Sequence, residues 1–280
     1  MRKLVIGCGY LGERVARAWQ QQGSEVFALT RSTETAARFR SLGIVPIVGD
    51  VLQPETLIFP EEIATCLYAV GLDRTSNFSQ RNVYVGGLSN VLQAESFSPR
   101  ELIYISSTSV YGQEDGSWVD ETSPTESETE SGRVCRDAEE LIRSQSKSPA
   151  NVIRLSGIYG PGRLLARIDQ LKNREPLRGN PEAWLNLIHV EDACRAVLAC
   201  EATGRASETY LVSDDRPVIR REYYTRLAEL AEAPEPVFQN DSASLGKRCR
   251  NRKARSELQL ELKFPSIEAG LPPLFADEPL

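Results

Sequence analysis

The chain has 280 residues, of which 41% are hydrophobic, and it carries 33 basic and 39 acidic residues for a net charge of −6. This composition is ample for the buried core of a globular protein with one domain or two lobes. The acidic balance argues against a general nucleic-acid or membrane-surface binder, so we expect neither partner.

The N-terminal apolar run is interrupted by glycines and stops at Glu13, which is too short for a secretory leader. The longest apolar run, residues 63–72, is about half the length of a membrane span. The six cysteines form no C-x-x-C pair and are scattered as buried free thiols would be. A single histidine excludes a histidine-based metal cluster. We therefore expect a cytoplasmic protein without a metal.

Short apolar runs alternate with amphipathic segments through the first half of the chain. The runs predict strands at 3–7, 25–30, 44–50, 63–70, 101–107 and 151–157, with a shorter strand at 208–213. Helical spacing predicts helices at 11–22, 33–42, 83–95, 190–202 and 220–233. Because each strand is apolar along its whole length, we expect a parallel sheet covered on both faces. The fold class is therefore α/β, a doubly wound Rossmann sheet with a small C-terminal lobe.

The domain boundaries follow from this pattern. We expect residues 1–155 to form the dinucleotide-binding domain, with 184–205 returning to it. Residues 156–183 and 206–280 would form a small lobe that binds substrate. The acidic segment at 120–131, DETSPTESETES, is either a solvated loop or a lid beside the site. The basic segment KRCRNRKAR at 247–255 could bind nucleic acid, but the acidic chain and the lack of interleaved aromatics favour a basic face of the lobe.

A glycine-rich loop follows the first strand and opens the first helix. It is GCGYLG, comprising Gly7, Cys8, Gly9, Tyr10, Leu11 and Gly12. Gly7 permits the tight turn, Gly9 lets the backbone approach a pyrophosphate, and Gly12 lets helix and strand pack closely. The helix N-terminus offers N–H groups and positive dipole to the phosphates. The loop therefore predicts a dinucleotide cofactor.

The end of the second strand indicates which dinucleotide is preferred. An NAD-binding protein would place Asp or Glu there for the ribose hydroxyls, but this chain has Thr30, Arg31 and Ser32. Without a carboxylate a 2′-phosphate is not repelled, and a guanidinium and a hydroxyl can bind it. We expect NADP(H) to be preferred over NAD(H).

Two further strand ends should contact the cofactor in this fold. Asp50 and Val51 end the third strand near the adenine. Ala69, Val70 and Gly71 end the fourth strand, where the chain passes beneath the cofactor. All five are predicted cofactor-binding residues.

Four motifs in a fixed order carry a resemblance that covers nearly the whole chain. They are the glycine loop, ISSTSVYG at 105–112, RLSGIYGPGR at 154–163 and NLIHVEDACRAVL at 186–198. Together they resemble the extended short-chain dehydrogenase/reductase family, the NAD(P)-dependent epimerases and dehydratases. The resemblance implies a Rossmann fold, a nicotinamide cofactor and a small-molecule substrate. It implies less about the reaction.

The resemblance also implies roles for single residues. Ser107 matches the family's active-site serine, and Tyr111 matches the tyrosine that closes that motif. Ser156 and Ile158 fall where the chain would meet the nicotinamide. The family's catalytic pair, Tyr-x-x-x-Lys, lies one helical turn apart, and its lysine lowers the pKa of the tyrosine.

This chain departs from the family at that pair. Ser131 stands at the tyrosine position and Cys135 at the lysine position, and no tyrosine in the chain has a lysine four residues later. Tyr111 and Tyr159 are candidate replacement phenols.

Two hypotheses follow. The chain is an NADP(H)-dependent oxidoreductase or epimerase with an altered site, or it binds NADP(H) without turnover as a redox sensor or scaffold. The retained ISSTSVYG motif favours the first hypothesis, and the missing pair favours the second. We expect a monomer or a homodimer, for which the helix carrying residues 84–92 could form the interface.

Overall fold

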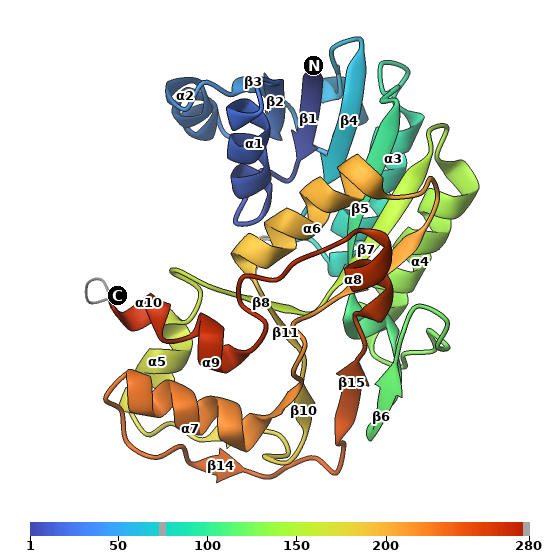
Figure 1. Cartoon of the computed structure of the whole chain (residues 1–280). Coiled ribbons are helices and arrows are strands. Elements are labelled where there is room, and N and C mark those ends of the chain that lie inside the picture. Colours follow the sequence, from blue (N-terminus) through green and yellow to red (C-terminus); the bar gives the residue numbers. More distant parts are fainter. Residues whose placement is uncertain (73–76, 277–280) are drawn as a thin grey trace.

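The computed structural model describes residues 1–72 and 77–276. Its centre is a sheet of seven strands in the order β12-β7-β5-β4-β1-β2-β3, in which every neighbouring pair is parallel (Figure 1). These strands are β1 (Arg2–Ile6), β2 (Glu25–Thr30), β3 (Val45–Val48), β4 (Ile63–Tyr68), β5 (Glu101–Ser107), β7 (Ala150–Leu155) and β12 (Thr209–Val212). The predicted α/β fold with a doubly wound parallel sheet is confirmed.

Helices cover both faces of this sheet. They are α1 (Gly12–Gln21), α2 (Thr33–Ser41), α3 (Gly87–Gln93), α4 (Glu130–Gln145) and α6 (Val190–Thr203). Val5 packs with residues of α1, α2 and α6, whereas Leu4 and Ile6 pack with residues of α3 and α4 on the other face. Successive side chains of a strand point to opposite faces, so a strand covered on both sides must be apolar throughout. That requirement explains the unbroken apolar runs.

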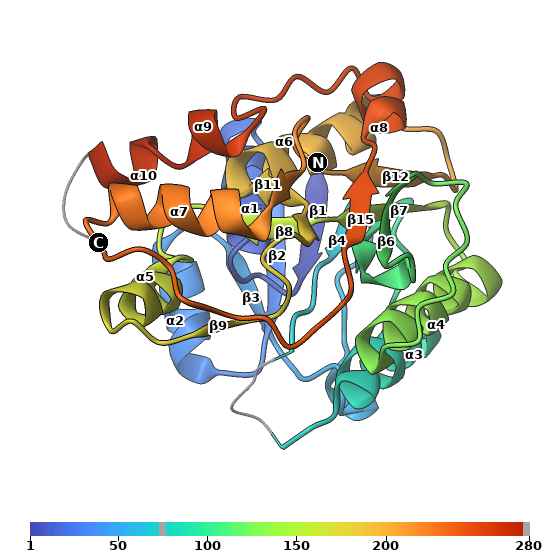
Figure 2. The same ribbon diagram turned by 90° about the horizontal axis from the view of Figure 1, so that it is seen from below.

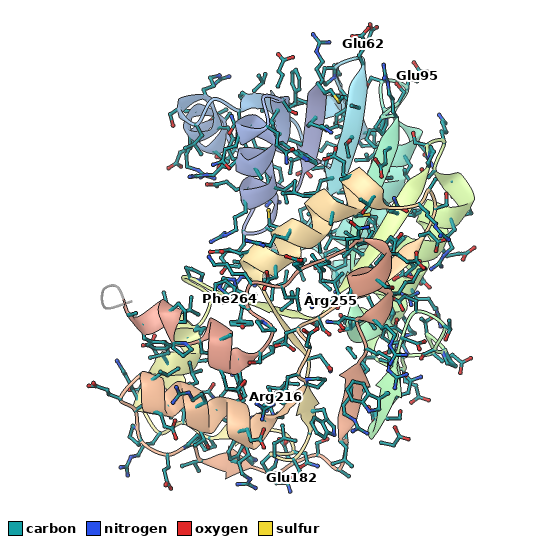
Figure 3. The ribbon with its side chains drawn as sticks, in the orientation of Figure 1. Glu62, Glu95, Glu182, Arg216, Arg255 and Phe264 are labelled. Carbon is teal, nitrogen blue, oxygen red and sulfur yellow. The ribbon has the colours of Figure 1, made fainter. Side chains whose placement is uncertain are left out.

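The smaller lobe lies at the carboxyl ends of the strands. It contains α5 (Leu165–Lys172), α7 (Arg220–Leu230), α9 (Ile267–Gly270), α10 (Pro273–Ala276), β9 (Leu177–Arg178), β10 (Trp184–Leu185), β13 (Val218–Ile219) and β14 (Phe238–Gln239). Its own core joins α5, α7 and α9, which lie together in Figure 2. In Figure 3, Glu182 and Arg216 mark this lobe, and Glu62 and Glu95 mark the opposite end of the sheet.

Short paired strands connect the lobe to the sheet. β8 (Gly157–Tyr159) pairs with β11 (Leu187–His189), and β15 (Gly246–Cys249) pairs with β6 (Asp115–Val119). Helix α8 (Arg252–Glu257) then packs against β12. The C-terminal segment therefore returns across the end of the sheet next to the chain that follows β5.

Two elements differ from the prediction. The predicted bounds place β12 in the lobe, but it pairs with β7 as the edge strand of the main sheet, and three of its four residues are buried there. The predicted helix at 83–95 is a π-helical segment, η2 (Asn82–Gly86), followed by α3. The end of the predicted lobe, residues 277–280, lies outside the described residues.

The acidic segment that precedes α4 is irregular and is anchored at several points. The Glu121 carboxylate accepts a hydrogen bond from the Leu211 N–H at 2.7 Å, and Ser127 is buried. The Thr129 hydroxyl accepts from the Gly132 N–H at 3.1 Å and so caps α4. Elsewhere, no helix within residues 1–72 and 77–276 is both long and apolar enough to cross a membrane.

Candidate functional site

A cavity of about 540 Å3 opens at the carboxyl ends of β1, β2, β4 and β5. The order of the sheet reverses between β1 and β4, and such a switch point is where open α/β sheets bind ligands. The predicted site residues that line the cavity are Gly7, Cys8, Gly9, Tyr10, Leu11, Thr30, Arg31, Asp50, Val51, Ala69, Val70, Gly71, Ser107, Cys135 and Ile158. The structure thus brings predicted residues from separate segments of the chain together around one cavity.

The glycine loop has the shape that a dinucleotide requires. Gly7 has φ +93°, and a Cβ there would lie 2.4 Å from the Ala69 backbone. A Cβ on Gly12 would lie 2.4 Å from the Gly7 carbonyl oxygen, so Gly12 supports the loop from behind. A Cβ on Gly9 would meet nothing within 4 Å, so its missing side chain leaves open space at the N-terminus of α1. A pyrophosphate fits that space, where backbone N–H groups attract anions.

The cavity carries little negative charge. Of the described lining residues, Asp50 is the one carboxylate, and Arg31 and Arg163 are the two guanidiniums. The Asp50 carboxylate accepts from the Leu52 N–H at 2.9 Å. Ser32 is not on the wall, because its hydroxyl accepts from the Thr35 N–H at 3.2 Å and caps α2. Arg31, which follows the end of β2, can hold an anionic group in this cavity.

Tyr10 connects the glycine loop to the lobe. Its ring lies between two guanidiniums, with Arg14 at 4.3 Å and Arg163 at 4.5 Å from the ring centroid. Its hydroxyl donates to the Pro161 carbonyl at 3.0 Å. Two positive charges therefore flank the ring close to the predicted pyrophosphate position. The sequence did not predict that Arg163 lines the cavity, because its position depends on the contact with the Tyr10 ring, which is distant in the chain.

The other end of the cavity is lined by Tyr84, Tyr104, Ser106, Ser107 and Cys135. The Ser107 hydroxyl accepts from the Ser109 N–H at 3.1 Å, which leaves its own proton available to a ligand. The Cys135 thiol accepts from the Ser109 hydroxyl at 3.5 Å. Burial raises the pKa of Cys135, so this thiol stays neutral and cannot replace an ammonium group.

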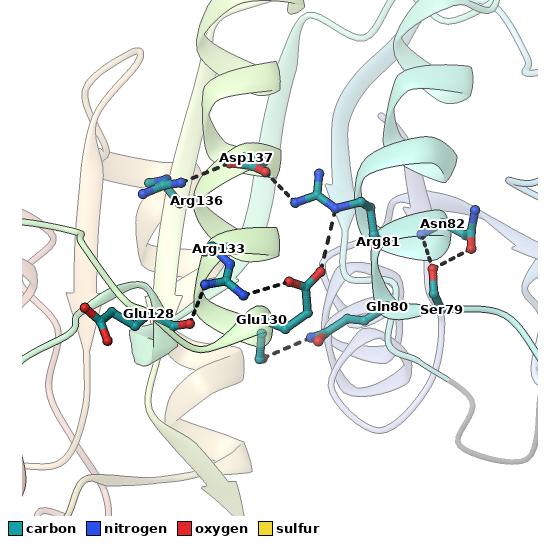
Figure 4. A network of polar contacts seen from close by, with 10 residues as sticks. Ser79, Gln80, Arg81, Asn82, Glu128, Glu130, Arg133, Arg136 and Asp137 are labelled. Atoms are coloured by element: carbon teal, nitrogen blue, oxygen red, sulfur yellow. Dashed lines mark hydrogen bonds and ion pairs between the residues drawn. The ribbon is translucent and has the colours of Figure 1, made fainter. Parts of the chain in front are cut away.

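Ser131 does not reach the cavity. Its hydroxyl accepts from the Gln80 amide at 3.1 Å. Further along α4, Asp137 forms an ion pair with Arg81 at 2.7 Å (Figure 4). These contacts join the start of α4 to η2. Ser156 also lies off the wall, and its buried hydroxyl has no partner among the described residues.

Tyr111 belongs to a buried polar network behind the cavity. Its hydroxyl accepts from Arg154 Nη1 at 2.9 Å. Arg154 also forms a two-point ion pair with Glu139 at 2.9 and 2.7 Å, and Ser106 donates to Glu139 at 2.7 Å. Burial raises the pKa of Tyr111, although Arg154 opposes the shift. The geometry therefore points to a structural role for this candidate phenol.

The second candidate phenol, Tyr159, lies in the core of the lobe. It is 2% exposed and is not on the cavity wall. Tyr84 is a half-buried phenol that lines the cavity on the Ser107 side, and the sequence prediction did not include it. No spacing motif marks Tyr84, because its neighbours on the wall are distant in sequence.

The cysteine thiols are buried, and residues of the basic segment contact other parts of the same chain. All six cysteines are free and buried, as predicted, and burial raises the pKa of Cys8 to about 12. Within the described ranges, no three His, Cys, Asp or Glu side chains gather as metal ligands would. Arg248 lies between the rings of Trp118 and Trp184, at 4.9 and 5.0 Å from their centroids. Lys247 donates to the Tyr111 carbonyl at 2.8 Å.

Two known proteins are similar to this chain in sequence. Protein YeeZ of Escherichia coli (strain K12) is 26% identical over 95% of this chain and 97% of its own length. A 4-hydroxy-2-methyl-3-oxo-4-farnesyl-3,4-dihydroquinoline-1-oxide ketoreductase of Stigmatella aurantiaca is 29% identical over 82% of this chain and 73% of its own length.

A functionally unknown conserved protein of Silicibacter pomeroyi has a solved structure that superposes with a TM-score of 0.81. It is 29% identical, covering 99% of this chain and 98% of that one. The model of the NAD dependent epimerase/dehydratase family matches residues 4–213. With this match across the whole sheet, and the glycine loop at its switch point, the chain belongs to the NAD dependent epimerase/dehydratase family.

Proposed function

We propose that the protein is an NADP(H)-dependent oxidoreductase or epimerase that acts on a small hydroxy or keto compound. One observation carries this proposal: the Ser107 hydroxyl and the glycine loop line the same cavity. A nicotinamide cofactor would supply or accept the hydride. The chain itself would hold the dinucleotide along 7–12 and 69–71. The Ser107 hydroxyl would donate to the substrate oxygen and orient the carbonyl for transfer.

Support also comes from the ketoreductase relative, whose name describes reduction of a carbonyl group. The buried free thiols fit a reducing compartment, and we propose the cytoplasm on that ground. A non-catalytic NADP(H) binder is the second candidate. The features that favour it are the Ser131 hydroxyl, which already accepts from Gln80, and the neutral Cys135 thiol.

NADPH oxidation in the presence of a panel of carbonyl compounds tests the activity. The panel includes 4-nitrobenzaldehyde, 9,10-phenanthrenequinone, a keto acid and a keto sugar, and products are followed by mass spectrometry to detect epimerisation. We expect turnover with at least one compound. Ser107→Ala should lower kcat/KM about a hundredfold, the usual effect of removing one donor to a developing oxyanion. Tight NADPH binding with no product from any compound would favour the non-catalytic candidate.

The cofactor preference can be tested by binding alone. Arg31 lies on the adenosine side of the cavity, and the Asp or Glu typical of NAD-binding proteins is replaced by Thr30. Arg31→Ala should weaken NADPH binding by roughly ten- to a hundredfold, the effect of losing a charge-assisted hydrogen bond worth about 1.5–3 kcal/mol. NADH binding should change less than threefold. Nucleotide fluorescence measures both constants, and equal losses for NADPH and NADH would contradict the assignment.

A further inference from the structure

Tyr84 lines the same cavity as Ser107 and Cys135. The Tyr84 side chain is half-buried. The hydroxyl accepts a hydrogen bond from the Leu72 N–H at 3.2 Å, and it donates to no group among the described residues. That arrangement orients the oxygen and leaves its proton for a ligand.

The segment that carries Tyr84 is held in place against α4. Tyr84 lies in the π-helical segment η2 and packs against the cluster that contains Val110 and Cys135. Just before it, Gln80 and Arg81 contact the first turns of α4 through Ser131, Glu130 and Asp137 (Figure 4). π-Helical turns occur often at functional sites because they re-aim a side chain. Ser131 therefore helps to position the segment that bears the phenol.

The other protic groups on this part of the wall are poorer acids or are inaccessible. The Ser107 hydroxyl is a far weaker acid than a phenol. The Ser106 hydroxyl already donates to the buried Glu139 carboxylate at 2.7 Å. Tyr104 is 3% exposed, and burial raises the pKa of the Cys135 thiol.

We infer that Tyr84 is the proton donor for carbonyl reduction in this protein, an inference that rests on the activity proposed above. The carbonyl carbon accepts a hydride from the reduced nicotinamide dinucleotide, which is oxidised. The carbonyl oxygen takes the proton of the Tyr84 hydroxyl, so the C=O group becomes an alcohol. The phenolate is stabilised by the Leu72 N–H and regains a proton from water in the cavity. The acid therefore comes from η2, whereas the family resemblance places it on α4.

The variant Tyr84→Phe removes the hydroxyl and keeps the ring. We expect kcat/KM for the panel compound that is reduced fastest to fall at least about a hundredfold, as removal of a general acid does. The NADPH dissociation constant should stay within about twofold, because Tyr84 acts on the substrate oxygen.

Tyr68→Phe is the matched control. Tyr68 is 2% exposed on β4, is not on the cavity wall, and its hydroxyl has no partner among the described residues. This variant should reduce the compound at the wild-type rate. Melting temperatures of both variants exclude a folding defect. Retention of more than a third of the rate by Tyr84→Phe would overturn the inference, and so would a loss of NADPH affinity equal to the loss of rate.

Acetylation of the free protein by N-acetylimidazole gives a readout that needs no turnover. Peptide mass spectrometry should find Tyr84 acetylated and protected by NADPH, with Tyr68 unmodified. An unmodified Tyr84 would overturn the inference, since the phenol would not be accessible in the cavity. If the wild type binds NADPH but converts no panel compound, the proposed function itself fails, and the inference fails with it. If the wild type and Tyr84→Phe are equally active, the inference about Tyr84 is wrong and the proposed function stands.

Discussion

Replacing Glu139 with alanine should lower the free energy of unfolding by about 3–5 kcal/mol, because it leaves a buried guanidinium without its counter-charge. The Arg154 and Glu139 side chains are 4% and 1% exposed, and two hydrogen bonds join them. The same change removes the acceptor of the Ser106 hydroxyl. Chemical denaturation followed by circular dichroism measures the loss.

The matched control for this prediction is Arg143→Gln. Arg143 also bonds Glu139, at 2.8 Å, but its side chain is 45% exposed. The Arg143 guanidinium is solvated, and Glu139 keeps its buried partner Arg154 in this variant, so the free energy of unfolding should fall by at most about 1 kcal/mol. Similar losses for the two variants would mean that burial does not set the strength of this network.

Gly9→Ala should abolish most NADPH binding while the protein stays folded. A Cβ at this position meets no protein atom within 4 Å, so the substitution fits the free protein. The methyl group would instead occupy the space next to the α1 N-terminus where a pyrophosphate must approach. Loss of two charge-assisted hydrogen bonds corresponds to at least about 3 kcal/mol, or roughly a hundredfold in affinity. Nucleotide fluorescence and a thermal melt measure binding and folding separately.

Gly7→Ala provides the contrast. Its Cβ would lie 2.4 Å from the Ala69 backbone, and its φ of +93° strains any side chain. We expect this variant to lose at least about 2 kcal/mol of stability. If Gly9→Ala binds NADPH normally, the pyrophosphate does not lie on this loop.

The strands of the main sheet could be predicted because each one is a short run of apolar residues, which is visible in the sequence without knowledge of its neighbours. A strand such as β4, which is covered on both faces, has to be apolar, and its bounds were found to within two residues. β9, β10 and β14 have only two residues each, so they present no periodicity to read. Strand β12 is visible in the sequence, but its membership of the main sheet depends on pairing with β7, which is distant in the chain.

The candidate site divides in the same way. The shape of the loop at Gly7 and Gly9 follows from local backbone geometry, which a short motif records. The positions of the Tyr111 and Tyr84 hydroxyls could not be predicted in this way, because both depend on residues that are distant in the chain. Tyr111 stands in a recognisable motif, but its hydroxyl accepts a hydrogen bond from Arg154 on β7. Tyr84 has no motif, and only the packing of η2 against α4 brings it beside Ser107.

Helix α6 covers one face of β1 and β5, and its residues come late in the chain. Val5 and Ile103 share a core cluster with Ala193 and Val197. A ribosome adding about 5–20 residues per second would need roughly 5–20 s to pass from the end of β5 to the end of α6. Through that interval the emerging sheet presents an apolar surface with no helix α6 to cover it. Burial of this face therefore depends on a helix that is synthesised well after the strands it covers.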